Sequence, residues 1–302
     1  MKSLTIKELV LASDGNLLIG NENECIYDVV IDSRKASKEN VFVAIIGENL
    51  DGHKFIKSAY ENGCKTFIKN ESSSINLDSS DINLIEVKDT ELALGMIAKY
   101  YKEKFNIPYI GVTGSVGKTT TRDMIYAAVS SKFDTLKNQG NLNNHFGVPL
   151  TLFNLNENYE CAVIEMGMSG FNEIKYLADI VNPGIGVISN IGLSHIENLG
   201  SQEGILKAKM EITTNFGPSN ILIVNGDDKL LSTLKDNNHN FILKTFGFDK
   251  DNDIYCESYD MGEEETKFIC YINGIKEEIF IPTVGEHNIY NAMSAILVGM
   301  SL

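Results

Sequence analysis

The feature that most constrains the fold of this chain is an apolar strand that runs into a glycine-rich turn and then a helix. The segment YIGVTGSVGKTT occupies residues 109–120. Glycines let the backbone curl so that successive N–H groups point at one phosphate, and the start of a helix adds partial positive charge. Lys118 is placed to reach the β- and γ-phosphates, and the Thr119 hydroxyl to ligate Mg²⁺. The motif predicts a nucleotide-binding α/β domain.

The glycine spacing departs from the usual phosphate-loop pattern. Val112 stands where a first glycine is expected, and Gly111 and Gly114 flank it. A tight strand-to-helix turn with an incidental lysine is the alternative interpretation. The strand context, the glycines and the Lys-Thr-Thr sequence together favour phosphate binding. The predicted nucleotide-binding residues of the loop are Gly114, Ser115, Val116, Gly117, Lys118, Thr119 and Thr120.

From residue 107 onward, apolar strands alternate with helical patterns, which is typical of a mostly parallel sheet covered on both faces. Strands are predicted at residues 109–112, 161–165, 185–189 and 221–224, and helices at 119–131 and 204–216. Antiparallel strands are predicted over residues 253–259 and 266–281, because Asn273-Gly274 between apolar runs is a hairpin signal. Residues 290–302 again show a helical pattern.

The first 88 residues form a separate pattern of short elements. Strands are predicted at residues 26–31, 41–46, 66–68 and 84–87, a helix at 53–62 and a polar loop at 70–83. A longer helical pattern covers residues 89–105. The chain is therefore interpreted as two α/β domains, residues 1–88 and 89–302, and its 302 residues are enough for two cores.

Composition excludes several classes of protein. The net charge of -15 argues against general nucleic-acid binding, since such a surface repels phosphate backbones. No apolar run approaches 18 residues, so no membrane span is expected. The N-terminus lacks a signal-peptide core, and the five cysteines form no CxxC pair. We expect a cytoplasmic protein with reduced thiols, most simply a monomer.

Three further residues are candidates for metal chemistry. Glu165 ends an apolar strand, where an acid in a nucleotide-binding sheet can hold Mg²⁺ beside the phosphate loop. His195 follows the next strand, although a lone loop histidine is more often structural. Spacing alone favours a solvated position for Lys209 on an amphipathic helix.

Six segments together resemble the Mur ligase family, over essentially the whole chain. They resemble in particular the branch of the family that adds D-alanyl-D-alanine. The glycine spacing around Val112 matches the nucleotide loop of that family. The segments are DSRKASKENVFVAIIGENLDGHKFI (32–56), TGSVGKTT (113–120), GNLNNHFGVPLTL (140–152), IEMGMSGFNEI with SHIENLGSQEGILKAKMEI (164–174 and 194–212), and GEHNIYNAMSA (285–295).

The resemblance implies a ligase that joins D-alanyl-D-alanine to UDP-N-acetylmuramoyl tripeptide through an acyl phosphate, in peptidoglycan synthesis. It implies a small N-terminal uridine-nucleotide-binding domain and a P-loop central domain with a small antiparallel extension. ATP and two Mg²⁺ ions are the expected cofactors. The implied catalytic and metal residues are Lys118, Thr119, Glu165, His195 and Lys209, the last as a carbamylated lysine. The implied ligand contacts are Ser33 and Arg34 for uridine, Asn143 and Asn144 for the muramoyl peptide, and His287, Asn288 and Asn291 near adenine.

Some residues and rival functions stay open. Arg34 could equally form a surface salt bridge, Asn143 and Asn144 a polar turn, and His287 with Asn288 a helix cap. His145 stands where this branch commonly has an acidic residue, and no role is assigned to it.

The family's third, C-terminal domain is expected to follow residue 302. Without it, we expect this polypeptide to bind the UDP-linked substrate, bind ATP weakly and turn over slowly or not at all. The alternatives are the branch that adds the third amino acid, a folate polyglutamylating enzyme, a non-catalytic fragment that binds UDP-muramoyl peptide, and a GTPase. The uridine-like segment argues against the folate enzyme, and no NKxD-like element supports a GTPase.

Overall fold

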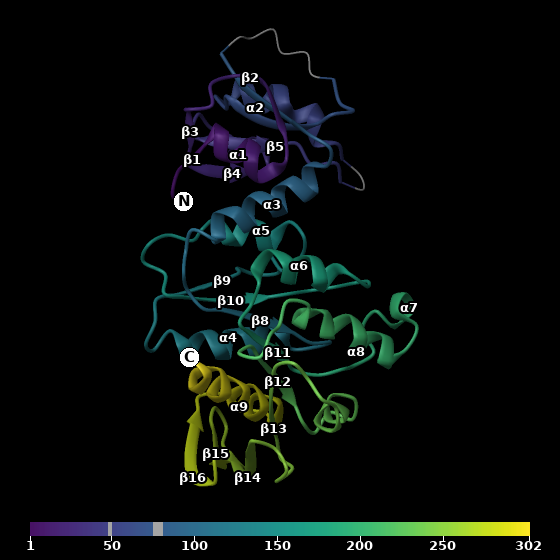
Figure 1. Ribbon diagram of the computed structural model, residues 1–302. Helices are drawn as coiled ribbons and strands as arrows, with labels where there is room; N and C mark the ends of the chain where they lie inside the picture. The colour runs from purple at the N-terminus through teal and green to yellow at the C-terminus, as the bar shows by residue number, and fades with distance from the viewer. Residues whose placement is uncertain (48–49, 75–80) are drawn as a thin grey trace. The chain divides into compact units, whose positions relative to one another are not determined.

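The computed structural model describes residues 1–47, 50–74 and 81–302, and the chain divides into two compact units (Figure 1). The first unit contains residues 1–106 and 145–157, and the second contains residues 107–144 and 158–302. Both units are mixed α/β, as the sequence predicts.

The first unit is built on a five-stranded sheet in the order β2-β7-β6-β5-β4. Its strands are β2 (Asn16–Ile19), β4 (Asp28–Val30), β5 (Asn40–Val43), β6 (Thr66–Asn70) and β7 (Asn83–Val87), with β1 (Leu4–Thr5) and β3 (Cys25–Ile26) as a separate pair. Its helices are α1 (Ile6–Ser13), α2 (Ile56–Glu61), α3 (Thr90–Lys102) and α5 (Gly147–Leu152), with short 3-10 turns at Ser33–Lys35 and Gly52–Phe55. Strands β4 to β7 are parallel, and β2 joins them antiparallel.

Most predicted elements of this unit are confirmed with shifted ends. The strand predicted at 26–31 is instead divided between β3 and β4, and the helix predicted at 53–62 begins as a 3-10 turn. Part of the predicted loop at 70–83, residues 75–80, lies outside the described residues. Helix α3 is capped by the Asp89 carboxylate, which accepts the N–H groups of Glu91 and Leu92. Because α3 packs against α1 and α5, it belongs to the first unit. The boundary predicted after residue 88 therefore falls one helix earlier than the division between the units.

The second unit is built on a nine-stranded sheet in the order β16-β15-β14-β13-β12-β11-β8-β10-β9. Its strands are β8 (Tyr109–Thr113), β9 (Thr135–Lys137), β10 (Cys161–Glu165), β11 (Ile185–Ile188), β12 (Ile221–Asn225), β13 (Ile242–Gly247), β14 (Ile254–Met261), β15 (Thr266–Ile272) and β16 (Ile275–Ile281). Its helices are α4 (Lys118–Val129), α6 (Glu173–Val181), α7 (Ile196–Leu199), α8 (Gln202–Met210) and α9 (Glu286–Ser301), with 3-10 turns at Glu211–Thr213 and Leu231–Asp236.

Burial explains why the centre of this sheet is parallel. Every residue of β8, β10 and β11 is buried, so these strands are covered on both faces. Helices α4 and α9 pack against each other, although their sequences are far apart (Figure 1). The predicted hairpin is confirmed, since Asn273 and Gly274 both have positive φ between β15 and β16. Strands β9 and β13 were not predicted.

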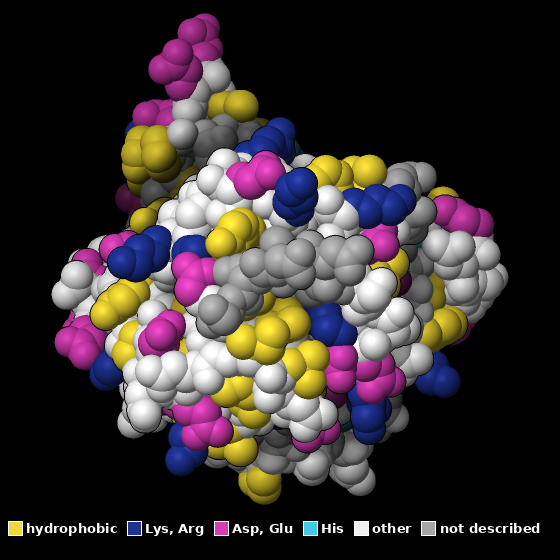
Figure 2. All heavy atoms as spheres, turned by 90° about the horizontal axis from the view of Figure 1, so that it is seen from above, with side chains coloured by type: hydrophobic (Ala, Val, Ile, Leu, Met, Phe, Trp, Pro, Cys, Tyr) yellow, Lys and Arg dark blue, Asp and Glu magenta, His cyan; other side chains and the backbone are white. Residues whose placement is uncertain are grey.

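Three properties of the described residues bear on the surface, the membrane and the thiols. Figure 2 shows acidic and basic side chains mixed over one face. Among residues 1–47, 50–74 and 81–302, no helix combines the length and the apolar character needed to cross a bilayer. All five cysteines fall within these ranges and are free, and all but Cys25 are buried.

Candidate active site

The phosphate loop connects β8 to α4 in the second unit. Gly117 takes φ +73°, a left-handed conformation that favours glycine, and no side chain in the described part of the chain caps the first N–H groups of α4. The Lys118 ammonium reaches back across the loop to the Gly114 carbonyl at 3.1 Å. Burial lowers the pKa of Lys118, while Glu165 opposes that shift. The loop therefore brings the N–H donors at the start of α4 and the Lys118 ammonium to the same side of the turn.

Glu165 lies at the carboxyl end of β10 and is 1% exposed. Its Oε2 accepts hydrogen bonds from the Thr119 hydroxyl at 3.0 Å and from Arg122 Nη1 at 3.2 Å. Its Oε1 accepts one from Asn143 Nδ2 at 2.7 Å. The carboxylate predicted to hold metal thus contacts the threonine predicted to share that role.

Arg122 is a site residue that the motif analysis did not identify. It is buried, and it donates to the Gly140 carbonyl as well as to Glu165. Its Nε and Nη2 both donate to Asp123 Oδ1, at 3.0 and 2.8 Å. Burial raises the pKa of Asp123, but hydrogen bonds from Lys137 and Arg122 outweigh it and lower the pKa overall. Side chains of alternating charge, Lys137, Asp123 and Arg122, therefore connect the partly exposed end of this network to Glu165.

Asn138 connects the loop after β9 to β10. It is fully buried; its Oδ1 accepts the Glu165 N–H, and its Nδ2 donates to the Glu165 and Leu142 carbonyls. The backbone around Glu165 is thereby fixed from a segment 27 residues away. Its hydrogen-bond partner Glu165 lies 27 residues away, so no local sequence pattern identified Asn138.

Lys209 lies on α8 and is 2% exposed, which corrects the solvated position that its spacing favoured. Burial, reinforced by the nearby charge of Lys118, lowers the pKa of Lys209 to about 7. A large fraction of this amine is therefore neutral near physiological pH. The helical pattern could not reveal this, because α8 buries a face that includes the lysine.

His195 takes a left-handed conformation, with φ +63°, at the start of α7. No cluster of three or more His, Cys, Asp or Glu side chains with metal-binding geometry occurs in residues 1–47, 50–74 and 81–302. The donors around the loop nevertheless suit a divalent cation bound with phosphate. Within the described part of the chain, the Thr113 and Ser115 hydroxyls are buried and have no hydrogen-bond partner, and the Thr119 hydroxyl contacts the Glu165 carboxylate. The residues present therefore fit Mg²⁺.

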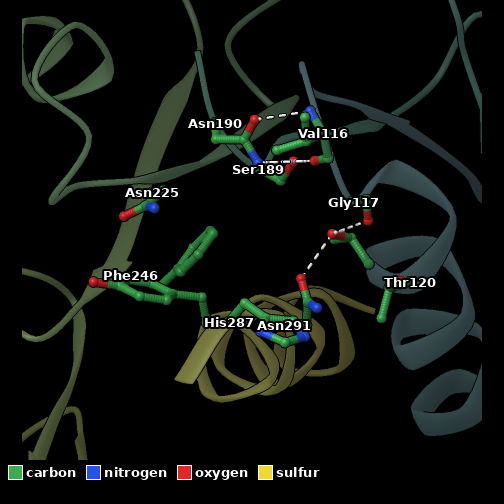
Figure 3. A pocket seen from close by; sticks show the side chains of 11 residues that line it. Val116, Gly117, Thr120, Ser189, Asn190, Asn225, Phe246, His287 and Asn291 are labelled. Carbon is green, nitrogen blue, oxygen red and sulfur yellow. Dashed lines mark hydrogen bonds between the residues drawn. The ribbon is translucent and has the colours of Figure 1, made fainter. Parts of the chain in front are cut away.

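A pocket of about 210 Å³ opens beside the phosphate loop (Figure 3). His287 and Asn291 of α9 line it, as does Phe246 of β13, and the Thr121 hydroxyl donates to Asn291 Oδ1 at 2.7 Å. Two of the three residues predicted near adenine are thus brought to this pocket. Asn288 instead donates to Thr283 and Val284, and it is not among the lining residues.

The residues predicted to contact uridine lie in the first unit and are described there alone. Ser33 is buried, and its carbonyl accepts a hydrogen bond from Asn62. Arg34 is exposed and forms a salt bridge with Asp32, whose pKa it lowers to about 2 through hydrogen bonds. The surface salt bridge considered for Arg34 is therefore present. His145, to which no role was assigned, has its Nε2 3.8 Å from a Glu91 carboxylate oxygen.

Two models of protein families match this chain. The model of the Mur ligase middle domain matches residues 112–299, and a model described as the catalytic domain of the Mur ligase family matches residues 26–102. The chain belongs to the Mur ligase family. The resemblance inferred from the motifs is thereby confirmed.

Two relatives of this Mur ligase chain share the same name. UDP-N-acetylmuramoyl-tripeptide--D-alanyl-D-alanine ligase of Bacillus subtilis is 41% identical over 278 residues, covering 92% of this chain and 59% of the relative. The ligase of the same name from Escherichia coli is 30% identical over 305 residues, covering 100% and 66%. This Mur ligase chain therefore spans between 59% and 66% of the length of these two relatives.

Solved structures agree with the fold. A crystal structure of MurF from Acinetobacter baumannii matches with a TM-score of 0.92 at 30% identity, covering 100% of this chain and 65% of that one. A MurF ligase from Thermotoga maritima, in complex with ADP, matches with a TM-score of 0.82 at 27% identity, covering 91% and 62%. The predicted fold class is confirmed.

Proposed function

We propose that this chain serves the ATP-dependent joining of D-alanyl-D-alanine to UDP-N-acetylmuramoyl tripeptide in peptidoglycan precursor synthesis. The observation that carries the proposal is the Thr119–Glu165 hydrogen bond of 3.0 Å beside Lys118. This bond joins a hydroxyl to a buried carboxylate whose charge acts on Lys118, and such a set of groups supports binding of Mg²⁺ together with nucleotide phosphates. The substrate is inferred from the activity for which the Bacillus subtilis and Escherichia coli relatives are named.

In the proposed reaction, the triphosphate of ATP lies against the start of α4 and Lys118, and the adenine enters the pocket lined by His287 and Asn291. The terminal carboxylate of the tripeptide attacks the γ-phosphorus, the bond to the β-phosphate oxygen breaks, and ADP leaves. The amine of D-alanyl-D-alanine then attacks the acyl phosphate, releases phosphate and a proton, and forms the amide. Lys118 offsets the repulsion between carboxylate and polyphosphate.

Thr119, Glu165 and His195 are the proposed holders of Mg²⁺, with Lys209 as a further ligand once carbamylated. Bound Mg²⁺ supplies charge neutralisation and orientation of the phosphates. The state of Lys209 supports this role, because CO₂ reacts with a neutral amine and the pKa of Lys209 is lowered to about 7. The product is a carbamate anion, with release of a proton. Because the amine is buried, few water molecules can reach it and hydrolyse the carbamate.

The substrate contacts are proposed residue by residue. Ser33 and Arg34 are proposed to bind the uridine nucleotide, and Asn143 and Asn144 to line the muramoyl-peptide path. The hydrogen bond from Asn143 to Glu165 supports a position for Asn143 close to where the terminal carboxylate of the tripeptide would react. Arg34 keeps an exposed guanidinium that a diphosphate could reach.

Calorimetric titration tests the proposal. We expect the chain to bind UDP-N-acetylmuramoyl tripeptide more tightly than UDP-glucose or UDP-N-acetylmuramoyl dipeptide, and to bind ATP in the presence of Mg²⁺. Equal binding of all three uridine ligands would reject the substrate assignment. Preference for the dipeptide would favour the branch that adds the third amino acid. If the chain binds UDP-N-acetylmuramoyl tripeptide but does not bind ATP, a non-catalytic binding role would be favoured.

A further inference from the structure

The segment that follows β11 packs directly against the phosphate loop, and we call residues 189–194 the brace. The Ser115 N–H donates to the Asn190 carbonyl at 3.1 Å, and the Ser194 hydroxyl donates to the Ser115 carbonyl at 3.2 Å. A Cβ added to Gly114 would clash with Ser189 Oγ, so any larger residue at this position forces the Ser189 side chain to move. The conformation of the loop thus depends on the brace.

The Asn190 side chain makes the most complete contact with the loop (Figure 3). Its Oδ1 accepts the N–H groups of Ser115 and Val116, at 3.1 and 3.0 Å. Its Nδ2 donates to the Val116 carbonyl at 2.9 Å and to Ser189 Oγ at 3.1 Å. One amide side chain therefore binds the N–H groups of buried Ser115 and exposed Val116 and the Val116 carbonyl, while the Ser115 N–H is shared with the Asn190 backbone carbonyl.

The brace is itself held from β12. Asp228 Oδ2 accepts the Ile191 N–H at 2.8 Å, and Asp228 Oδ1 accepts the N–H groups of Leu230 and Leu231. Asp228 is consequently fixed by its own turn while it holds the residue next to Asn190. Such a support keeps the Asn190 amide in one orientation.

We propose that Asn190 is a positioning residue of the nucleotide site. Because Asn190 occupies the N–H groups of Ser115 and Val116, the triphosphate is bound by Lys118 and by the uncapped N–H groups at the start of α4. Asn190 sets the curvature that aims these groups at the phosphates. This inference rests on the proposed function, because it assumes that the loop binds a nucleotide.

The first experiment separates positioning of the phosphates from contact with the base. Asn190 also lines the pocket, so a direct base contact is the rival role. We would titrate the chain and its Asn190→Ala variant with ATP, inorganic tripolyphosphate and adenosine, each with Mg²⁺. Loss of the hydrogen bonds should weaken ATP and tripolyphosphate by about tenfold, and adenosine by less than about threefold.

The outcomes are distinguishable. Unchanged tripolyphosphate affinity in Asn190→Ala, or a loss confined to adenosine, would overturn the positioning role while leaving the proposed function intact. A parent chain that binds neither ATP nor tripolyphosphate would overturn both. Asn237→Ala is the matched control, because its side-chain amide donates to the Thr233 carbonyl within an exposed turn, and it should leave all three affinities unchanged.

A second pair of variants keeps the test valid if Asn190→Ala folds poorly. Gly114→Ala places a methyl group against Ser189 Oγ and should weaken tripolyphosphate by about tenfold. Adding Ser189→Gly removes that obstacle and should recover at least half of the loss in binding free energy. Recovery would support control of the loop by the brace, and its absence would overturn that control.

Discussion

The chain has two arginines, one in each compact unit, and each forms a salt bridge with a carboxylate. The Arg34 side chain is 86% exposed, and its partner Asp32 is two residues away. The Arg122 side chain is 4% exposed, and its partner Glu165 is 43 residues away. The same chemistry is therefore used once as a local surface feature and once as a long-range buried one.

The difference shows which charges hold the fold and which stay available to a ligand. An exposed pair gains little, because water and salt screen both charges. A buried pair contributes little net stability either, yet removing one partner leaves the other charged without compensation. Arg122 is consequently part of the architecture around Glu165, whereas Arg34 can exchange its partner for a ligand phosphate.

The largest expected effect is that of Arg122→Met. We expect the free energy of unfolding to fall by about 3 to 5 kcal/mol, since Glu165 and Asp123 both lose a buried partner. Urea denaturation measures this change. Arg122→Lys is the matched control, because it keeps the positive charge but loses the planar set of N–H donors. It should lower the free energy of unfolding by less than Arg122→Met does. A loss below about 1 kcal/mol in Arg122→Met would show that Thr119 and Asn143 satisfy Glu165 unaided.

Sequence reasoning located the parts of the fold that depend on neighbours along the chain. The phosphate loop, the fully buried strand β10 and the Asn273-Gly274 hairpin each have a local pattern, and all three are confirmed. Strand β13 was missed because its sequence, ILKTFG, mixes charged and apolar residues without clear alternation. Its place in the sheet comes from pairing with β12.

The candidate site divides in the same way. Glu165 was identified because an acidic residue at the end of an apolar strand can be recognised from the sequence alone. Arg122 and Asn190 were missed because their partners lie 43 and 74 or more residues away, and no spacing rule connects them. Lys209 was placed by resemblance rather than by pattern, and its burial became apparent only from the packing of α8.

A smaller effect is expected from the buried amine of Lys209. Its folded pKa, about 7, lies below the unfolded value of 10.5, so between these values the unfolded chain binds more protons. Stability should therefore rise with pH across this window, by up to about 1.4 kcal/mol per pH unit. Lys209→Met should remove that slope. Urea denaturation from pH 7 to 10, in CO₂-free buffer, compares the two chains; equal slopes would show that Lys209 is charged and hydrated.

The smallest effect on stability is expected at Arg34, and it sharpens the contrast with Arg122. Arg34→Met should leave the thermal midpoint unchanged, because an exposed pair two residues apart is screened by solvent. If Arg34 binds the uridine nucleotide, the same variant should lose about tenfold in affinity for UDP-N-acetylmuramoyl tripeptide. Arg122→Lys should show the reverse, with weaker ATP binding and unchanged uridine binding.

The ionic strength of the titration decides what kind of contact Arg34 makes. A contact with a diphosphate should weaken as salt rises, and Arg34→Met should reduce that dependence. Asp32→Asn is the matched control: it removes the charge of the carboxylate that pairs with the Arg34 guanidinium, and it should retain or improve binding. If Arg34→Met lowers the thermal midpoint as Arg122→Met does, the two arginines play the same structural role. If neither its affinity nor its midpoint changes, Arg34 is a surface salt bridge and the uridine site lies elsewhere in the first unit.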